Sequence, residues 1–197
     1  MQRFQPFLFK PIPSEVGFDL DAMVEEVRAA FFAEIEDRYE VRIGRSRGSP
    51  LACIWYNLMG RGQHVIYFHP VLNHPGTPRE VLAFIAKHEL THAVRPDVSG
   101  QYDGHPPEFW EHEFRVGPER FAAWHWIYEN VGACLRRDRG RLRVRRQWRT
   151  LQPAMRTPYT PHLPFEGNLF EQYCPEGGAQ MRLPPDWATR PAPMGEG

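Results

Sequence analysis

The chain has 197 residues, 42% of them hydrophobic, and its 24 basic side chains match 24 acidic ones. This length supports one folded core and excludes two full domains, and the zero net charge excludes a bias of the whole molecule towards nucleic acid or membrane lipid. The sequence has no apolar run of membrane-spanning length and no basic start followed by an apolar stretch, so we expect a cytoplasmic location without membrane contact. Three scattered cysteines fit reduced thiols in that compartment.

A helix and then three strands are expected in the first third of the chain. Residues 18–39 carry apolar side chains at helical spacing, and either Asp19 or Asp21 can cap the start of this helix. Three segments rich in β-branched and aromatic residues follow at 39–45, 51–58 and 64–69. Glycine-containing turns separate them, which predicts a three-stranded antiparallel sheet and an α+β fold.

The next helix is expected to begin near residue 78 and carries the most informative motif of the chain. Thr77-Pro78-Arg79-Glu80 matches a capping box with proline at the first helical position. Four residues apart on that helix, His88 and His92 lie on one face about 6 Å apart, where both imidazoles can bind one metal ion. Glu89 lies close to such a metal but is badly angled to ligate it, which is the position of a general base.

A catalytic zinc ion needs a third protein ligand and an open position for water. We expect His105 to be that ligand, because it follows Gly104 in a loop just before a helix that opens with two prolines. Three residues of that helix compete for the role: Glu108, Glu111 and His112. The spacing therefore predicts a Zn2+ site on His88, His92 and one further side chain.

His-Glu-Leu-Thr-His-Ala followed by Asp-Gly-His-x-Pro-Glu-Phe-Trp resembles the SprT-like metallopeptidases and the related WLM and YgjP-type proteins. The resemblance implies a zincin-like metalloprotease core with an active-site helix and further helices, placed in residues 1–150. It also implies that His88, His92 and His105 hold zinc and that Glu89 is the general base.

Two features depart from the family pattern. Pro106 stands where the family often has glycine after the third histidine, so the local backbone must differ. Many members also carry a cysteine-rich zinc ribbon, for which Cys53, Cys134 and Cys174 are too few and too far apart.

The resemblance implies hydrolysis of peptide bonds in a protein or peptide substrate, and zinc chemistry supports this mechanism. Zinc lowers the pKa of its bound water to about 7, and Glu89 accepts the proton and passes it to the leaving amine. The strand at residues 64–69 could be the edge that pairs with an extended substrate. Five residues could stabilise the oxyanion, and spacing does not rank them: Tyr102, His112, Arg115, His125 and Tyr128.

Two helices are expected at residues 107–116 and 118–135, and a basic segment follows them. It contains Arg136, Arg137, Arg139, Arg141, Arg143, Arg145, Arg146 and Arg149. Alternation with apolar residues favours a strand with one basic face, although a bent helix would also fit. Such a face could bind DNA phosphates, which suggests DNA-associated proteins as substrates. A solvated or acid-paired face is the other interpretation.

The alternative function of the protein is a zinc-holding nucleic-acid-binding module with little or no peptidase activity.

Residues 151–197 form a proline-rich C-terminal extension that cannot build regular helices or a sheet of any size. Its aromatic and aliphatic side chains favour an extended wrap on the core, with a lid over the cleft as the alternative. From Pro184 onward we expect disorder.

Overall fold

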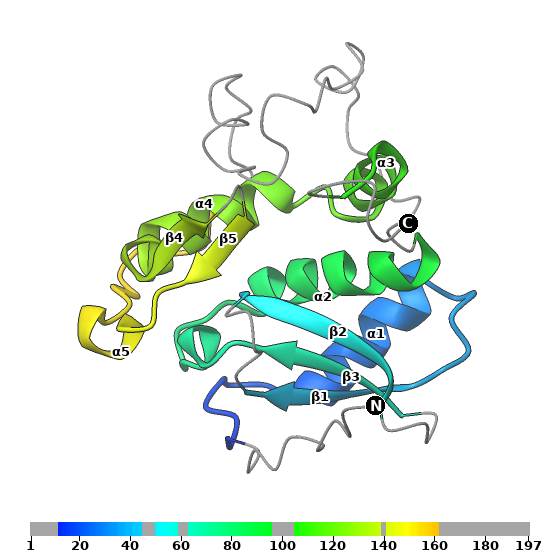
Figure 1. Cartoon of the computed structure of the whole chain (residues 1–197), viewed down its shortest axis with the longest axis horizontal. Coiled ribbons are helices and arrows are strands. Elements are labelled where there is room, and N and C mark those ends of the chain that lie inside the picture. The colour runs from blue at the N-terminus through cyan, green and yellow to red at the C-terminus, as the bar shows by residue number, and fades with distance from the viewer. Residues whose placement is uncertain (1–11, 45–49, 59–62, 96–104, 139–140, 162–197) are drawn as a thin grey trace, which may run out of the picture.

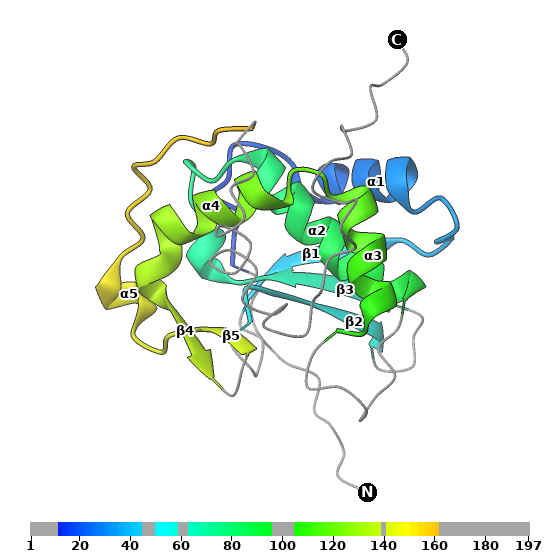
Figure 2. The same cartoon turned by 90° about the horizontal axis from the view of Figure 1, so that it is seen from above.

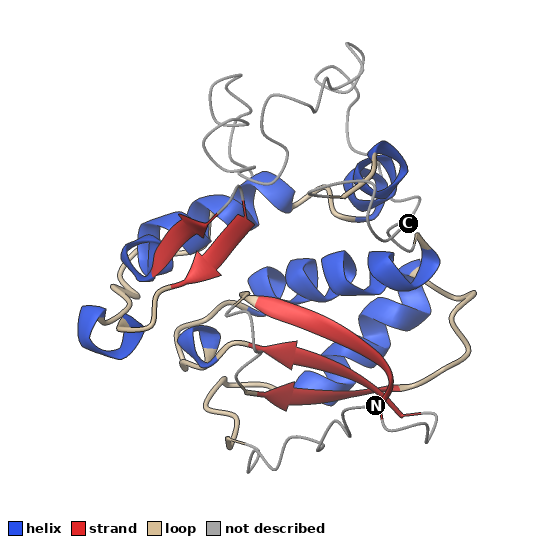
Figure 3. Ribbon diagram, in the orientation of Figure 1, coloured by secondary structure: helices blue, strands red, loops and turns tan. Residues whose placement is uncertain are grey.

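The computed structural model describes residues 12–44, 50–58, 63–95, 105–138 and 141–161, and this part of the chain has an α+β fold (Figure 1). The helices are α1 (Leu20–Phe31), α2 (Arg79–Val94), α3 (Pro107–Val116), α4 (Arg120–Val131) and α5 (Trp148–Leu151). The strands are β1 (Tyr39–Ile43), β2 (Ala52–Leu58), β3 (Gln63–Phe68), β4 (Leu135–Asp138) and β5 (Arg141–Val144). Figure 3 shows the strands as two separate sheets with the helices around them.

The three-stranded sheet is mixed, so the prediction of an antiparallel sheet was wrong. Its order is β1-β3-β2, with β3 parallel to β1 and antiparallel to β2. The physical reason lies in burial: Val65, Ile66 and Phe68 of β3 are all at most 1% exposed, and a strand covered on both faces belongs in the centre of a sheet. The expected edge strand is therefore the central one, and β2 is the edge beside α2.

α1 begins as the sequence predicts but ends at Phe31 rather than near residue 39. The Asp19 carboxylate caps it by accepting a hydrogen bond from the Ala22 amide at 3.0 Å. Asp21 instead accepts from the Val41 amide and ties the helix to β1. The helix stops where Phe32 and Ile35 both turn into the core, so tertiary burial decides its end.

α2 lies at the centre of the fold, between the sheet and the pair α3 and α4 (Figures 1 and 2). Its buried side chains surround most of the helix, because it contacts α1, α3, α4 and β2. It starts near the predicted residue, but the predicted capping box is absent. The Thr77 hydroxyl donates to the Leu72 carbonyl at 2.8 Å, and Pro78 occupies the N-cap without a side-chain bond.

The arginine-rich segment begins as a hairpin of β4 and β5, rather than a single strand or a bent helix, and its last arginine, Arg149, lies in α5. α4 ends at Val131, earlier than predicted, and a 3-10 turn over Gly132–Cys134 leads into β4. Leu142 and Val144 are buried, so the apolar face of β5 points inwards. Of the eight arginines, Arg139 lies outside the described residues.

Residues 152–161 run along α4. The Ala154 amide donates to the Asn130 carbonyl at 2.7 Å, and the Thr157 amide donates to the Asn130 side chain at 2.9 Å. Residues 162–197 of the predicted extension lie outside the described residues, and the boundary at residue 150 stays a prediction. None of the described helices combines the length and apolar character needed to cross a membrane.

Candidate metal centre

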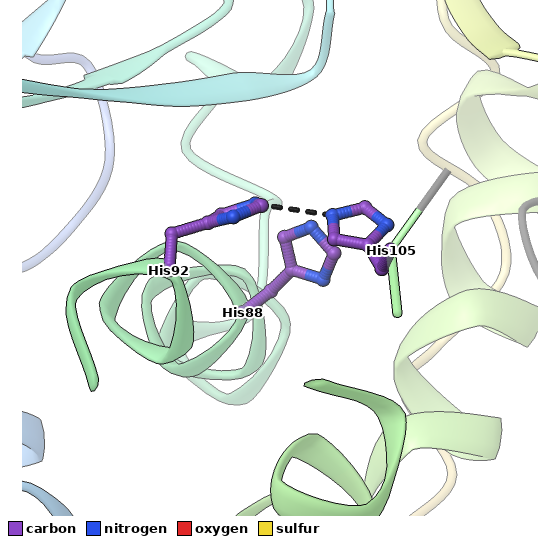
Figure 4. A group of neighbouring side chains, drawn as sticks. All are labelled: His88, His92 and His105. Atoms are coloured by element: carbon purple, nitrogen blue, oxygen red, sulfur yellow. Dashed lines mark hydrogen bonds between the residues drawn. The ribbon is translucent and has the colours of Figure 1, made fainter. Parts of the chain in front are cut away.

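Three histidines gather in the space between α2 and α3 (Figure 4). His88 and His92 come from adjacent turns of α2, and His105 precedes α3. Their ligand nitrogens all lie within 4.8 Å of one another, and the two Nε2 atoms of His92 and His105 are 3.1 Å apart. Pro106 has the extended conformation of a helix N-cap, which turns the chain from His105 directly into α3.

The spacing of these nitrogens suits a metal ion. Two nitrogens that each lie 2.0–2.1 Å from a tetrahedral zinc are about 3.3 Å apart. The His92 and His105 nitrogens, at 3.1 Å, already stand near that separation. Imidazole donors also suit copper, iron and nickel, so the cluster fits a metal ion without fixing which one.

Aromatic rings hold the imidazoles in place. The Phe109 ring is fully buried, and its centroid lies 4.0 Å from that of His105, 4.6 Å from His92 and 5.1 Å from His88. Trp110 packs edge-on against His105 at 4.9 Å. The first turn of α3 therefore restricts the ring positions of all three histidines.

Burial keeps His92 neutral. Removal from water, and then the neighbouring His88, lower the pKa of His92 to about 3. A metal binds the neutral imidazole through its lone pair, so this histidine needs no deprotonation before it can act as a ligand near neutral pH.

Glu89 lies in the same cavity as the three histidines. This cavity has a volume of about 470 Å3, and Glu89 is only 5% exposed. The remaining walls are mainly apolar and come from distant parts of the chain: Pro50, Leu51, Ala52, Cys53, Ile54, Phe84, Ile85, Trp124 and Leu142. A few polar groups that converge in an apolar cavity are typical of binding and active sites.

The competing ligands predicted from the sequence lie elsewhere. Glu108 and Glu111 are exposed on α3, and the His112 ring packs against Phe32 at 5.7 Å. The structure thus brings His105, rather than these three, next to His88 and His92. The ligand roles, and the role of Glu89 as base, stay predictions.

The described oxyanion candidates do not line the cavity. This holds for His112, Arg115, His125 and Tyr128, whereas Tyr102 lies outside the described residues.

Sequence reasoning missed Glu113 of α3. Its Oε1 atom lies 2.5 Å from Nδ1 of His88, and its side chain is completely buried. Its other oxygen forms an ion pair with Arg120, the first residue of α4. A signal was available, because Glu113 lies four residues after Phe109 on the buried face of α3, and a buried acid needs a partner.

No protein-family model, no curated protein and no solved structure matches this chain. The likeness to SprT-like metallopeptidases therefore depends on the motif in residues 80–112.

Proposed function

We propose that this protein is a zinc-dependent metallopeptidase that hydrolyses peptide bonds. The position of Glu89 carries the proposal: a buried carboxylate shares one cavity with three histidines that can hold a metal ion. A closed structural zinc site uses four protein ligands, whereas a catalytic site uses three and keeps one position open. Among the described residues the cluster contains three.

In this proposal His88, His92 and His105 hold the zinc ion, and Glu89 transfers protons. A bound zinc ion would lower the pKa of a water molecule to about 7 and polarise the substrate carbonyl. The Glu89 carboxylate accepts the proton and returns it to the leaving amine nitrogen. The apolar walls of the cavity strengthen these electrostatic interactions, because they exclude water.

We place the substrate along β2. This strand is the edge of the sheet, and Ala52, Cys53 and Ile54 line the cavity that holds the histidines. An extended peptide can add to such an edge by backbone hydrogen bonds, with side chains in the adjacent pockets. The edge thus offers a way to present a peptide bond beside Glu89.

DNA-associated proteins are the substrate class that we propose on the basis of the hairpin. Leu142 of β5 lines the cavity, and the adjacent Arg143 points to the opposite face of the strand. Arg143 is the register partner of Arg136, which is exposed. Arg145 instead donates to the Leu135 carbonyl at 2.8 Å, so this arginine holds the hairpin together. Basic groups beside the cavity favour a substrate bound close to DNA.

The alternative is a zinc-holding nucleic-acid-binding module, which needs no general base beside the metal and so does not account for the position of Glu89. A chelator experiment separates the two functions. We expect the zinc-loaded protein to cleave an unfolded protein substrate, to stop when a chelator removes the metal, and to resume when zinc is returned. Cleavage that persists without metal would contradict the proposal.

A further inference from the structure

We propose that Glu113 is a positioning residue for His88, and that Arg120 in turn fixes Glu113. The Glu113 carboxylate accepts a hydrogen bond from Nδ1–H of His88 and so directs Nε2 of this imidazole to the metal. The inference rests on the proposed zinc centre, and it assigns roles to two residues that lie outside the histidine motif.

The hydrogen bond sets the tautomer of His88. An ionised carboxylate can only accept, so the Nδ1 atom that lies 2.5 Å from Glu113 Oε1 must carry the proton. A neutral imidazole with a proton on Nδ1 has its lone pair on Nε2. Metal-bound histidines commonly donate their second N–H to a carboxylate in this way, which orients the ring and raises its basicity.

The carboxylate itself has little freedom to move. Glu113 is 0% exposed and Arg120 is 1% exposed, and their ion pair joins α3 to the start of α4. The Arg120 guanidinium also stacks over the rings of Trp110 at 4.8 Å and Phe114 at 5.1 Å. Arg120 both compensates the buried negative charge and keeps Glu113 from leaving His88.

A second buried ion pair provides a matched control. Lys87 precedes His88 on α2, and Glu119 precedes Arg120; their Nζ and Oε1 atoms are 2.7 Å apart. This pair also ties α2 to the start of α4, with side chains 7% and 19% exposed. Glu119 bonds a lysine rather than a candidate ligand, so its loss reports only the structural cost of breaking a buried pair.

The test compares Glu113→Gln with Glu119→Gln. Zinc affinity is measured by competition with a chromophoric chelator, and folding by thermal unfolding of the metal-free proteins. We expect Glu113→Gln to weaken zinc binding by about 10- to 100-fold, the usual effect of losing such a partner. Glu119→Gln should lower the unfolding temperature and leave zinc affinity unchanged. Equal zinc affinities in the two variants would overturn the proposal.

Glu113→Gln leaves Arg120 buried without its counter-ion and could fail to fold. The double variant Glu113→Gln/Arg120→Met removes both charges and keeps the apolar stem of residue 120. It should fold and still show the loss of zinc affinity; wild-type affinity in this variant would overturn the proposal.

The tautomer of His88 gives a readout that needs no variant. Nitrogen-15 NMR of the metal-free wild-type protein should show a proton on Nδ1 of His88, and a neutral ring with its proton on Nε2 would overturn the proposal. None of these measurements involves cleavage, so the two proposals can fail separately. A protein that binds zinc and cleaves nothing would refute the peptidase proposal alone.

Discussion

α2 and the β4–β5 hairpin carry the two groups of residues on which the proposed function depends, and they are built in opposite ways. α2 is covered by α1, α3, α4 and β2, and its histidines contact the Phe109 ring. The hairpin consists of two four-residue strands with an exposed Arg136. Packing against buried side chains fixes the positions of the histidines. The hairpin arginines contribute positive charge, and what this charge does depends on the molecule that binds there.

The largest effect is expected at the proposed zinc site on α2, where a single substitution should remove the metal. His105→Ala removes the one histidine of the cluster, among the described residues, that does not come from α2, and an open two-histidine site binds zinc weakly. We expect metal analysis to show about one zinc per chain in the wild type and much less in the variant. His112→Ala is the control and should keep its zinc; the reverse result would place the third ligand on α3.

Two truncations compare the packing around the histidines of α2 with the packing of the hairpin. Phe109→Ala removes a fully buried ring among the three histidines and should cost about 3–5 kcal/mol of unfolding free energy. Leu142 of the hairpin lines the cavity and so has fewer packing partners on that side, and Leu142→Ala should cost about 2 kcal/mol, the lower end for such changes. Urea unfolding of the two variants measures both values. A larger loss for Leu142→Ala would mean that the hairpin is the better-packed region.

Acid should destabilise the metal-free protein through His92. The folded pKa of about 3 lies below the ordinary value, so this contribution to stability is full above pH about 6.5 and is lost as the pH falls towards 3. One proton accounts for at most about 1.4 kcal/mol per pH unit. We expect the unfolding free energy, measured with urea between pH 7.5 and 4.5, to fall less steeply in His92→Gln than in the wild type. Identical slopes would show that His92 is not the group responsible.

The smallest effect is expected from the hairpin arginines. Replacing Arg136 and Arg143 with glutamine should reduce the slope of log DNA affinity against log salt by about 2, and leave zinc content unchanged. Arg42→Gln on β1 is a control with an arginine that lies outside the hairpin. DNA binding with no salt dependence in the wild type would remove the phosphate-contact proposal.

The features predictable from the sequence are those set by local geometry. Helical spacing alone places His88 and His92 on one face, and Asp19, the observed cap, is one of the two candidates that precede the apolar stripe. Features set by distant contacts were missed. Glu113 meets His88 across 25 residues of sequence. A competing local bond was missed as well: the Thr77 hydroxyl donates to the Leu72 carbonyl instead of capping the helix that follows.

The order of the strands in the sheet is also set by distant contacts. Each strand of the three-stranded sheet was predicted within one or two residues, but the pairing of β1 with β3 depends on which strand is covered on both faces. α1 packs against β1 and α2 packs against β2, and the strand pattern alone does not place these helices. The mixed sheet, and with it the identity of the edge strand, therefore required the structure.

The role of Glu89 is tested most directly by zinc content and peptide cleavage, measured together on the wild type and on Glu89→Gln. Both proteins should bind about one zinc per chain, and only the wild type should cleave an unfolded protein at an appreciable rate. The loss of a general base predicts a decrease of about 100- to 10,000-fold. Zinc-loaded wild type that cleaves no substrate, or a Glu89→Gln variant that cleaves as fast as the wild type, would contradict the proposed function.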